Sequence, residues 1–146
     1  MLAGYSGTPL IKKLGLKPPM QVLTSGAPEE YPEWLGELPG GVVLTASAVA
    51  PVEAAHLFVT ERAALEAQLE SLRRTLDQAG FIWVSWPKKS SRVPTNITED
   101  TIRQVALPMG YVDVKVCAVS DTWSGLKLVI RKSERIQTIP PPKAAP

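Results

Sequence analysis

The sequence predicts an α/β domain of three layers, in which helices cover both faces of a mostly parallel, Rossmann-like sheet that ends in an antiparallel hairpin. Apolar runs of strand length alternate with helical patterns along the chain. The run from Phe81 to Trp86 is apolar on both alternating faces, as a central strand covered on two sides must be. Near the C-terminus, two alternating segments are separated by only six residues, Ser120 to Gly125, which predicts the hairpin. Strands and helices at these spacings predict right-handed crossovers.

The expected elements follow one another with short connections. They are helices over residues 10–14, 30–38, 60–80 and 96–107, and strands over residues 20–24, 41–47, 56–59, 81–86, 112–118 and 126–130.

Capping residues set the expected helix ends. Thr8 and Pro9 precede the first helix and Gly15 ends it. Asn96, with Glu99 three residues later, fits the reciprocal capping arrangement at the start of the last helix.

Apolar periodicity sets the expected buried faces. The stripe of the long helix recurs at spacings of four, three and four residues, and Gly80 is the expected end of that helix. The stripe consists of Leu65, Leu69, Leu72 and Leu76. In the following hairpin, the packed face of the first strand is expected to carry Val112, Val114, Val116 and Ala118.

Composition bounds the organisation and the class of protein. The chain has 146 residues, 45% of them hydrophobic and 21% charged, which excludes a disordered chain and a coiled coil. We expect a single domain over residues 1–136, followed by a disordered proline-rich tail from Gln137 to Pro146. The single cysteine, Cys117, excludes an intramolecular disulfide and a zinc site built from two thiolates.

Charge and hydropathy indicate the environment. A net charge of +2 is too small and too dispersed to predict a nucleic-acid or membrane partner. No segment has the roughly 18 consecutive apolar residues of a membrane helix, and the first residues lack the apolar core of a signal peptide. The expected location is the cytoplasm.

The candidate site comes from topology. Ligands of parallel sheets bind beyond the carboxyl ends of the strands, where two loops are expected to lie side by side. The expected ligand-binding residues are Trp86, Lys88, Lys89 and Arg92 in the first loop and Asp121, Trp123, Ser124 and Lys127 in or beside the second. Indole rings, cations, hydroxyls and free amides near Asn96 suit an anionic or nucleotide-like small molecule. The alternative is a solvated basic loop, with Trp86 and Trp123 capping the core.

Other candidate residues favour structural roles. His56, the single histidine, has no cysteine or carboxylate at metal-ligand spacing, and Cys117 lies within a strand. We therefore assign no catalytic residue, no metal ligand and no particular cofactor, and leave open whether the protein is an enzyme. The leucine stripe is expected in the core, although its spacing would also suit a homo-oligomer seam.

Several literal segments carry a family resemblance that spans almost the whole ordered chain. They are Gly4 to Leu10, Lys13 to Gly15, Leu57 to Thr60, Trp86 to Lys89, Asp113 to Val119 and Thr122 to Lys127. In these segments the chain resembles the bacterial domain-of-unknown-function family 3052. The resemblance implies a small cytoplasmic bacterial protein and brings no catalytic residues.

A second resemblance concerns the fold alone. The half from His56 to Lys132 is similar to the closing half of the Rossmann-type methyltransferase fold, which also ends in an antiparallel hairpin. The first half departs from that pattern, because Gly26 is the only glycine in the first turn and Thr45-Ala46-Ser47 offers no carboxylate for ribose hydroxyls.

Two hypotheses of function remain. The first is a domain that binds a small anionic ligand at the two loops. The second is a protein-interaction module without a small-molecule site, whose exposed tryptophans and proline-rich tail meet another protein.

Overall fold

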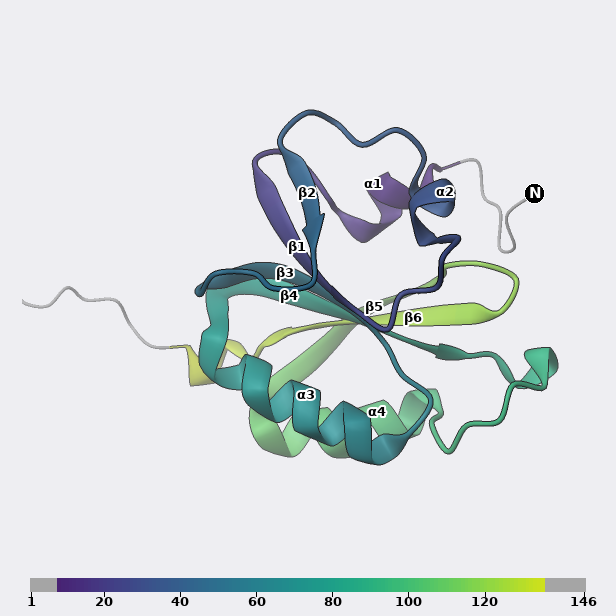
Figure 1. The fold of residues 1–146 in the computed structure, drawn as a ribbon. Coiled ribbons are helices and arrows are strands. Elements are labelled where there is room, and N and C mark those ends of the chain that lie inside the picture. Colours follow the sequence, from purple (N-terminus) through teal and green to yellow (C-terminus); the bar gives the residue numbers. More distant parts are fainter. Residues whose placement is uncertain (1–7, 136–146) are drawn as a thin grey trace, which may run out of the picture.

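The computed structural model describes residues 8–135, which form a six-stranded sheet between two layers of helices (Figure 1). The strands are β1 (Met20–Ser25), β2 (Val42–Thr45), β3 (Val52–Phe58), β4 (Leu76–Pro87), β5 (Tyr111–Ala118) and β6 (Trp123–Ile130). Their order is β2-β1-β3-β4-β6-β5. Strands β2, β1, β3 and β4 are parallel, and β6 runs antiparallel to both β4 and β5. The predicted class, a mostly parallel sheet ending in an antiparallel hairpin, is confirmed.

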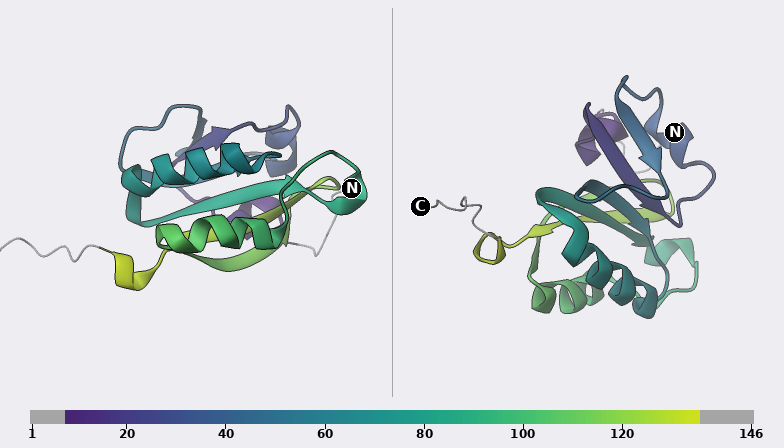
Figure 2. Two further views of the ribbon diagram at one scale, coloured as in Figure 1. Left: turned by 90° about the horizontal axis from the view of Figure 1, so that it is seen from below. Right: turned by 60° about the vertical axis from the view of Figure 1, so that its left-hand side comes forward.

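Helices cover both faces of the sheet. Helices α1 (Leu10–Leu14) and α2 (Tyr31–Leu35) lie on one face, and α3 (Arg62–Thr75) and α4 (Glu99–Ala106) lie on the other. Figure 2 shows α3 and α4 side by side beneath the sheet. Within residues 8–135 there are also three short 3-10 turns: η1 (Lys89–Ser91), η2 (Leu107–Met109) and η3 (Lys132–Glu134).

Each face of the sheet has its own apolar core. The predicted leucine stripe of α3 is fully buried at Leu65 and Leu69 and packs with α4 against the sheet. On the opposite face, Leu14 of α1 and Tyr31 of α2 belong to one buried cluster with Trp83, at the centre of β4. Trp83 also donates its indole N–H to the Leu14 carbonyl at 2.9 Å. β4 is therefore mid-sheet and covered on both faces, as its apolar sequence predicts.

Helix α3 ends earlier than predicted. Leu76 already pairs with Val52 as the first residue of β4, and Gly80 lies within that strand instead of closing the helix. A Cβ atom on Gly80 would lie 2.9 Å from the Glu53 carbonyl oxygen. This glycine lets the backbones of β3 and β4 approach each other, a use that the sequence does not distinguish from a helix end.

The predicted caps are only partly correct. Helix α4 begins with a capping box of Thr98 and Thr101, not with Asn96 and Glu99. Asn96 instead accepts a 2.7 Å hydrogen bond from the backbone N–H of Arg62, so that it caps α3 across the molecule. No side chain caps α1, for which Thr8 was the expected cap, whereas Gly15 ends that helix in the left-handed region with φ 75°.

Strand β5 is exposed on the side predicted to be packed. Val114 and Val116 are 54% and 50% exposed. β5 lies at the edge of the sheet, and its register shifts between Asp113 and Lys115. The alternation of Val and polar residues is a strand pattern here, but the bulge and the edge position leave these valines without a covering helix.

Two further predictions concern segments outside the described residues: the proline-rich tail and the N-terminal segment from Gly4 to Gly7. No helix within residues 8–135 is long and apolar enough to cross a membrane.

Candidate functional site

The parallel strands end at one edge of the sheet, on the right in Figure 1, which we call the carboxyl edge. Lys88, directly after β4, donates its backbone N–H to the Thr122 carbonyl at 2.7 Å. Pro87 is opposite Trp123 in the β4-β6 pairing. The structure therefore brings together the two loops that the sequence placed at this edge, and a backbone hydrogen bond joins them.

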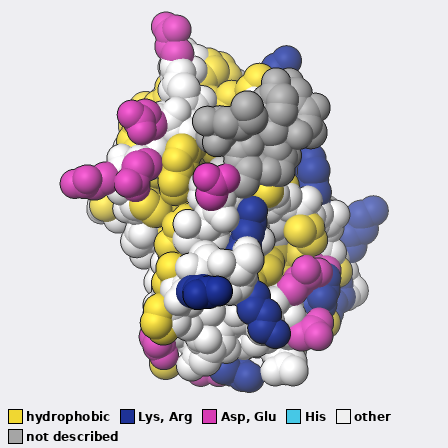
Figure 3. Space-filling model, turned by 90° about the vertical axis from the view of Figure 1, so that its right-hand side faces the viewer, with side chains coloured by type: hydrophobic (Ala, Val, Ile, Leu, Met, Phe, Trp, Pro, Cys, Tyr) yellow, Lys and Arg dark blue, Asp and Glu magenta, His cyan; other side chains and the backbone are white. Residues whose placement is uncertain are grey.

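The basic side chains of the first loop surround η1. Lys88 is half-buried, whereas Lys89 and Arg92 are exposed. Arg92 has φ 64°, and its backbone N–H bonds to the Lys89 carbonyl, which closes the turn. None of the ion pairs within residues 8–135 involves these three cations. Figure 3 shows the molecule from this edge, with Lys and Arg side chains near its centre.

A hollow of about 280 Å³ opens between α2 and the β5-β6 hairpin turn. We call it the carboxyl-edge hollow, and it is lined by Pro28, Glu30, Trp34, Ser120, Asp121, Thr122 and Trp123. Only Asp121 and Trp123 belong to the site predicted from sequence. The residues of the β1-α2 loop were missed, although the rule applied to β4 could have found them, because they too follow the carboxyl end of a parallel strand.

The hairpin turn beside the hollow is well ordered by its own hydrogen bonds. The hydroxyl of Ser120 accepts from the backbone N–H groups of Thr122 and Trp123 at 3.2 and 3.1 Å. Its oxygen is therefore used in the turn. Asp121 at the tip is exposed, so its carboxylate can accept hydrogen bonds from a ligand.

The two predicted tryptophans lie on opposite faces of the sheet. Trp86 is 8% exposed and packs in the core beneath α3 and α4. Trp123 is half-buried and packs on the α1-α2 face, with its ring edge-to-face on Phe58 at 5.1 Å between centroids. Ser124 pairs opposite Trp86. The structure thus places Trp123 at the hollow and gives Trp86 a core position, so one indole of the predicted pair is available to a ligand.

Lys127 lies away from both loops. It is four residues along β6 from Trp123, a separation of about 13 Å, and pairs with Trp83 and Lys115 in the middle of the sheet. Its ammonium nitrogen lies 4.5 Å from the centroid of the Phe81 ring. The structure does not bring this predicted residue to the carboxyl edge.

His56 forms a buried polar chain behind the hollow. Its Nδ1 atom lies 2.7 Å from the hydroxyl oxygen of Tyr31, and its Nε2 atom lies 2.7 Å from the Ser85 hydroxyl. The ring stacks on Phe58 at 4.3 Å between centroids. Burial lowers the pKa of His56 to about 3 and raises that of Tyr31. A neutral, fully bonded histidine links α2, β3 and β4, consistent with the structural role predicted from sequence.

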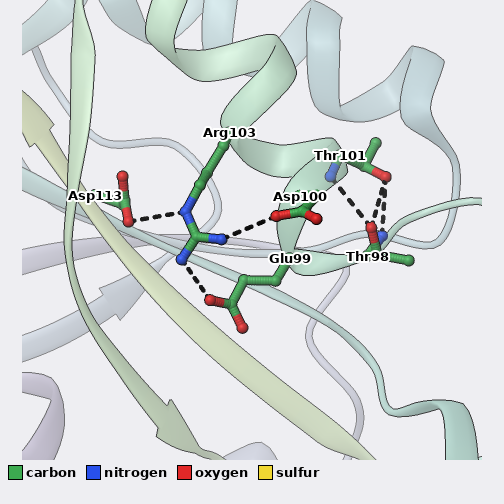
Figure 4. Close-up of polar contacts among 6 residues, drawn as sticks. All are labelled: Thr98, Glu99, Asp100, Thr101, Arg103 and Asp113. Atoms are coloured by element: carbon green, nitrogen blue, oxygen red, sulfur yellow. Dashed lines mark hydrogen bonds and ion pairs between the residues drawn. The ribbon is translucent and has the colours of Figure 1, made fainter.

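The largest ion-pair cluster of the described residues also has a structural role (Figure 4). Arg103 of α4 contacts Glu99 and Asp100 in the same helix and donates from Nε to Asp113 of β5 at 3.0 Å. The carboxylate hydrogen bonds raise the pKa of Arg103. Two of the three carboxylates lie in α4 and Asp113 lies in β5, so the shared guanidinium connects α4 to the edge strand. Within the described part of the chain, no group of three or more His, Cys, Asp or Glu residues is placed to hold a metal ion.

Comparisons with known proteins show the fold. No protein-family model matches the chain, and no curated protein matches it in sequence. Among solved structures, the chain is similar to a putative type 11 methyltransferase from Sulfolobus solfataricus, with 13% identity, a TM-score of 0.62, and coverage of 88% of this chain and 94% of that one. A SAM-dependent methyltransferase from Aquifex aeolicus has 17% identity, a TM-score of 0.60, and coverage of 83% and 87%. Fibrillarin from Aeropyrum pernix, with S-adenosylmethionine bound, has 12% identity, a TM-score of 0.57, and coverage of 86% and 70%.

The residues at the crevice of this fold do not fit S-adenosylmethionine. From β1 the chain continues to β2 on one side and then to β3 on the other side, so the strand order reverses between β1 and β3. A doubly wound sheet binds its cofactor at such a reversal. Gly26 follows β1 with φ 70°, and a Cβ atom on it would lie 2.6 Å from the Phe58 carbonyl oxygen. The missing side chain therefore lets the turn pack closely against the end of β3. Strand β2 ends at Thr45 and offers no carboxylate to a ribose.

Proposed function

We propose that this protein binds an anionic, nucleotide-like small molecule at the carboxyl edge of a methyltransferase-like fold. The planar part of the ligand would lie against Trp123 in the carboxyl-edge hollow. The anionic group would meet Lys88, Lys89 and Arg92 on the η1 side of the hairpin turn. The observation that carries the proposal is the 2.7 Å hydrogen bond from Lys88 to Thr122, because it holds the basic loop against a residue that lines the hollow.

The cations of the first loop suit the anionic end of a ligand, and the carboxylates that line the hollow suit its hydroxyl or amino groups. Lys88, Lys89 and Arg92 have no ion-pair partner within residues 8–135, so they are available to a phosphate or carboxylate. Glu30 and Asp121 line the hollow and are exposed. Ionised carboxylates only accept hydrogen bonds, so these two suit the hydroxyl or amino groups of a nucleotide-like molecule.

The alternative of a protein-interaction module has less support. Its premise was exposed tryptophans, but Trp83 and Trp86 are buried and Trp34 and Trp123 are half-buried. The proline-rich tail, its other premise, lies outside the described residues.

We also infer membership in the bacterial domain-of-unknown-function family 3052 and a cytoplasmic location. Two of the segments that carry this resemblance, Trp86 to Lys89 and Thr122 to Lys127, meet along the β4-β6 pairing at the candidate site. The proposal gives those two segments a shared role in ligand binding.

The test compares AMP with adenosine and inorganic phosphate, measured by calorimetry and by tryptophan fluorescence. AMP should bind more tightly than either fragment, and its binding should alter the emission of the tryptophans that line the hollow. In Lys88→Ala, we expect AMP to lose about 1.5–3 kcal/mol where a charge-assisted hydrogen bond is removed. Lys89→Ala should lose less, because that exposed ammonium is more fully hydrated.

Lys132→Ala is the matched control, since it removes one exposed lysine from η3. It should bind AMP as the unmodified chain does. If AMP and adenosine bind equally, or if Lys88→Ala and Lys132→Ala have the same affinity, the anion site at this edge is wrong.

A further inference from the structure

Three lysines gather on the α1-α2 face of the sheet, away from the carboxyl edge. Lys115 of β5 and Lys127 of β6 are directly opposite each other in the antiparallel pairing. Lys17, shortly after α1, is close enough for its charge to act on Lys127. The ammonium nitrogen of Lys127 lies 4.5 Å from the centroid of the Phe81 ring, which directs it along the sheet face beneath α1.

No carboxylate of the described residues compensates these charges. Within residues 8–135, neither Lys17, Lys115 nor Lys127 forms an ion pair with a carboxylate. Burial lowers the pKa of Lys127, and the charges of Lys115 and Lys17 lower it further. Like charges directly opposite on paired strands are destabilising. The folded chain therefore holds a local positive charge that an anion would relieve.

An apolar hollow adjoins the lysines. It has a volume of about 460 Å³, we call it the α1 hollow, and it is lined by Ile11, Lys12, Gly15, Leu16, Lys17, Pro18 and Pro39. Lys17 belongs to both the hollow and the lysine group. Gly15 also connects the hollow to the lysines: it lines the hollow, and a Cβ atom on it would lie 4.0 Å from the Lys127 ammonium nitrogen. The cations therefore border an enclosure whose wall is largely apolar.

We propose that this surface binds a small organic anion, with its phosphate or carboxylate among Lys17, Lys115 and Lys127 and its apolar part in the α1 hollow. Charge complementarity identifies the anionic group, and the lining of the hollow identifies the apolar part. The site is separate from the carboxyl-edge hollow, since Lys127 and Trp123 are about 13 Å apart along β6.

The test uses phenyl phosphate and benzoate as organic anions and inorganic phosphate as the bare anion. Binding is measured by calorimetry at low ionic strength, with sodium chloride added to a matched ionic strength as a blank. Phenyl phosphate should bind about tenfold more tightly than inorganic phosphate, because its ring leaves water for the hollow. Benzoate shows whether a carboxylate replaces the phosphate at the lysines.

Lys115→Gln removes one exposed cation without disturbing the core, and Lys132→Ala is its charge-matched control. We expect Lys115→Gln to weaken phenyl phosphate by about threefold to tenfold, the range for a partly exposed charge contact. The same variant should raise the melting temperature of the free protein, because it relieves the repulsion with Lys127. Lys127→Met, which keeps the aliphatic stem over Phe81, should also weaken phenyl phosphate binding and raise the melting temperature.

Three results would overturn the proposal. They are binding of neither organic anion above the salt blank, equal affinity of Lys115→Gln and Lys132→Ala for phenyl phosphate, and equal affinity of the unmodified protein for phenyl phosphate and inorganic phosphate. A loss confined to Lys88→Ala would assign the anion to the carboxyl edge and also exclude the α1 hollow. Failure of AMP to bind at the carboxyl edge leaves this test unchanged, because the two sites share no lysine.

Discussion

Acidification should destabilise this protein through His56, the only histidine in the chain. Its side chain is 1% exposed and lies between the hydroxyls of Tyr31 and Ser85, each 2.7 Å from a ring nitrogen. Burial lowers the pKa of the folded-state imidazole to about 3, whereas an unfolded chain has a histidine pKa of about 6.5. The unfolded state therefore binds more protons between these two values.

The sign and size of the effect follow from proton linkage. The contribution of a depressed histidine is fully present above the unfolded pKa and is lost as the pH falls toward the folded pKa. Between about pH 7.5 and about pH 5, protonation of the unfolded histidine should lower the free energy of unfolding by about 2 kcal/mol. This figure depends only weakly on the folded pKa, because at pH 5 the folded histidine stays neutral for any value well below that pH.

Urea unfolding followed by tryptophan fluorescence measures the effect at several pH values within this window. His56→Gln is the control, because glutamine offers a donor and an acceptor but does not titrate. We expect the variant to be less stable near neutral pH, yet to lose much less stability than the unmodified chain on acidification. Carboxylates, with ordinary pKa values near 4, act mainly below the window.

Parallel pH profiles for the two proteins would refute the reasoning. They would mean that His56 is protonated to the same extent in the folded and unfolded states, so the imidazole would be neither buried nor held neutral by Tyr31 and Ser85.

Other predictions test the turn, the ion pairs, the thiol and the cofactor. Gly26→Ala should lower the free energy of unfolding by about 2–4 kcal/mol in urea, because it adds a left-handed alanine and a clash with the Phe58 carbonyl; a change below 1 kcal/mol would contradict the packed turn. Arg103→Ala should lower the melting temperature more than Arg62→Ala, because Arg103 bonds three carboxylates and Arg62 bonds one; equal shifts would argue against the cluster. Cys117 should react slowly with thiol reagents in the folded protein, because burial raises its pKa; labelling as fast as in urea would refute this. Calorimetry should show no micromolar binding of S-adenosylmethionine, and a micromolar complex would overturn the conclusion that the crevice does not fit this cofactor.

Local patterns in the sequence carried much of the fold. Leu65, Leu69 and Leu72 of α3 and the capping glycine of α1 were predicted correctly, because both patterns depend on neighbours within a few residues, whereas Leu76 of the predicted stripe lies in β4. The errors arose where one local sequence pattern is compatible with two different structures. Asn96 is a good cap, but the helix start it satisfies belongs to α3, 34 positions away in the sequence. Val114 alternates as a strand residue should, yet its exposure depends on a bulge and on the edge position of β5.

The candidate site shows the same division. The sequence by itself determined that loops after β4 and in the final hairpin meet at one edge, because parallel strands place their carboxyl ends together. Only the tertiary structure decided which side chains face that edge. Strand pleating puts Trp86 and Trp123 on opposite faces, and the β4-β6 register puts Lys127 in mid-sheet. The β1-α2 loop completes the hollow from a distant part of the chain. These features depend on register and packing between segments far apart in sequence, and no short-range periodicity encodes them.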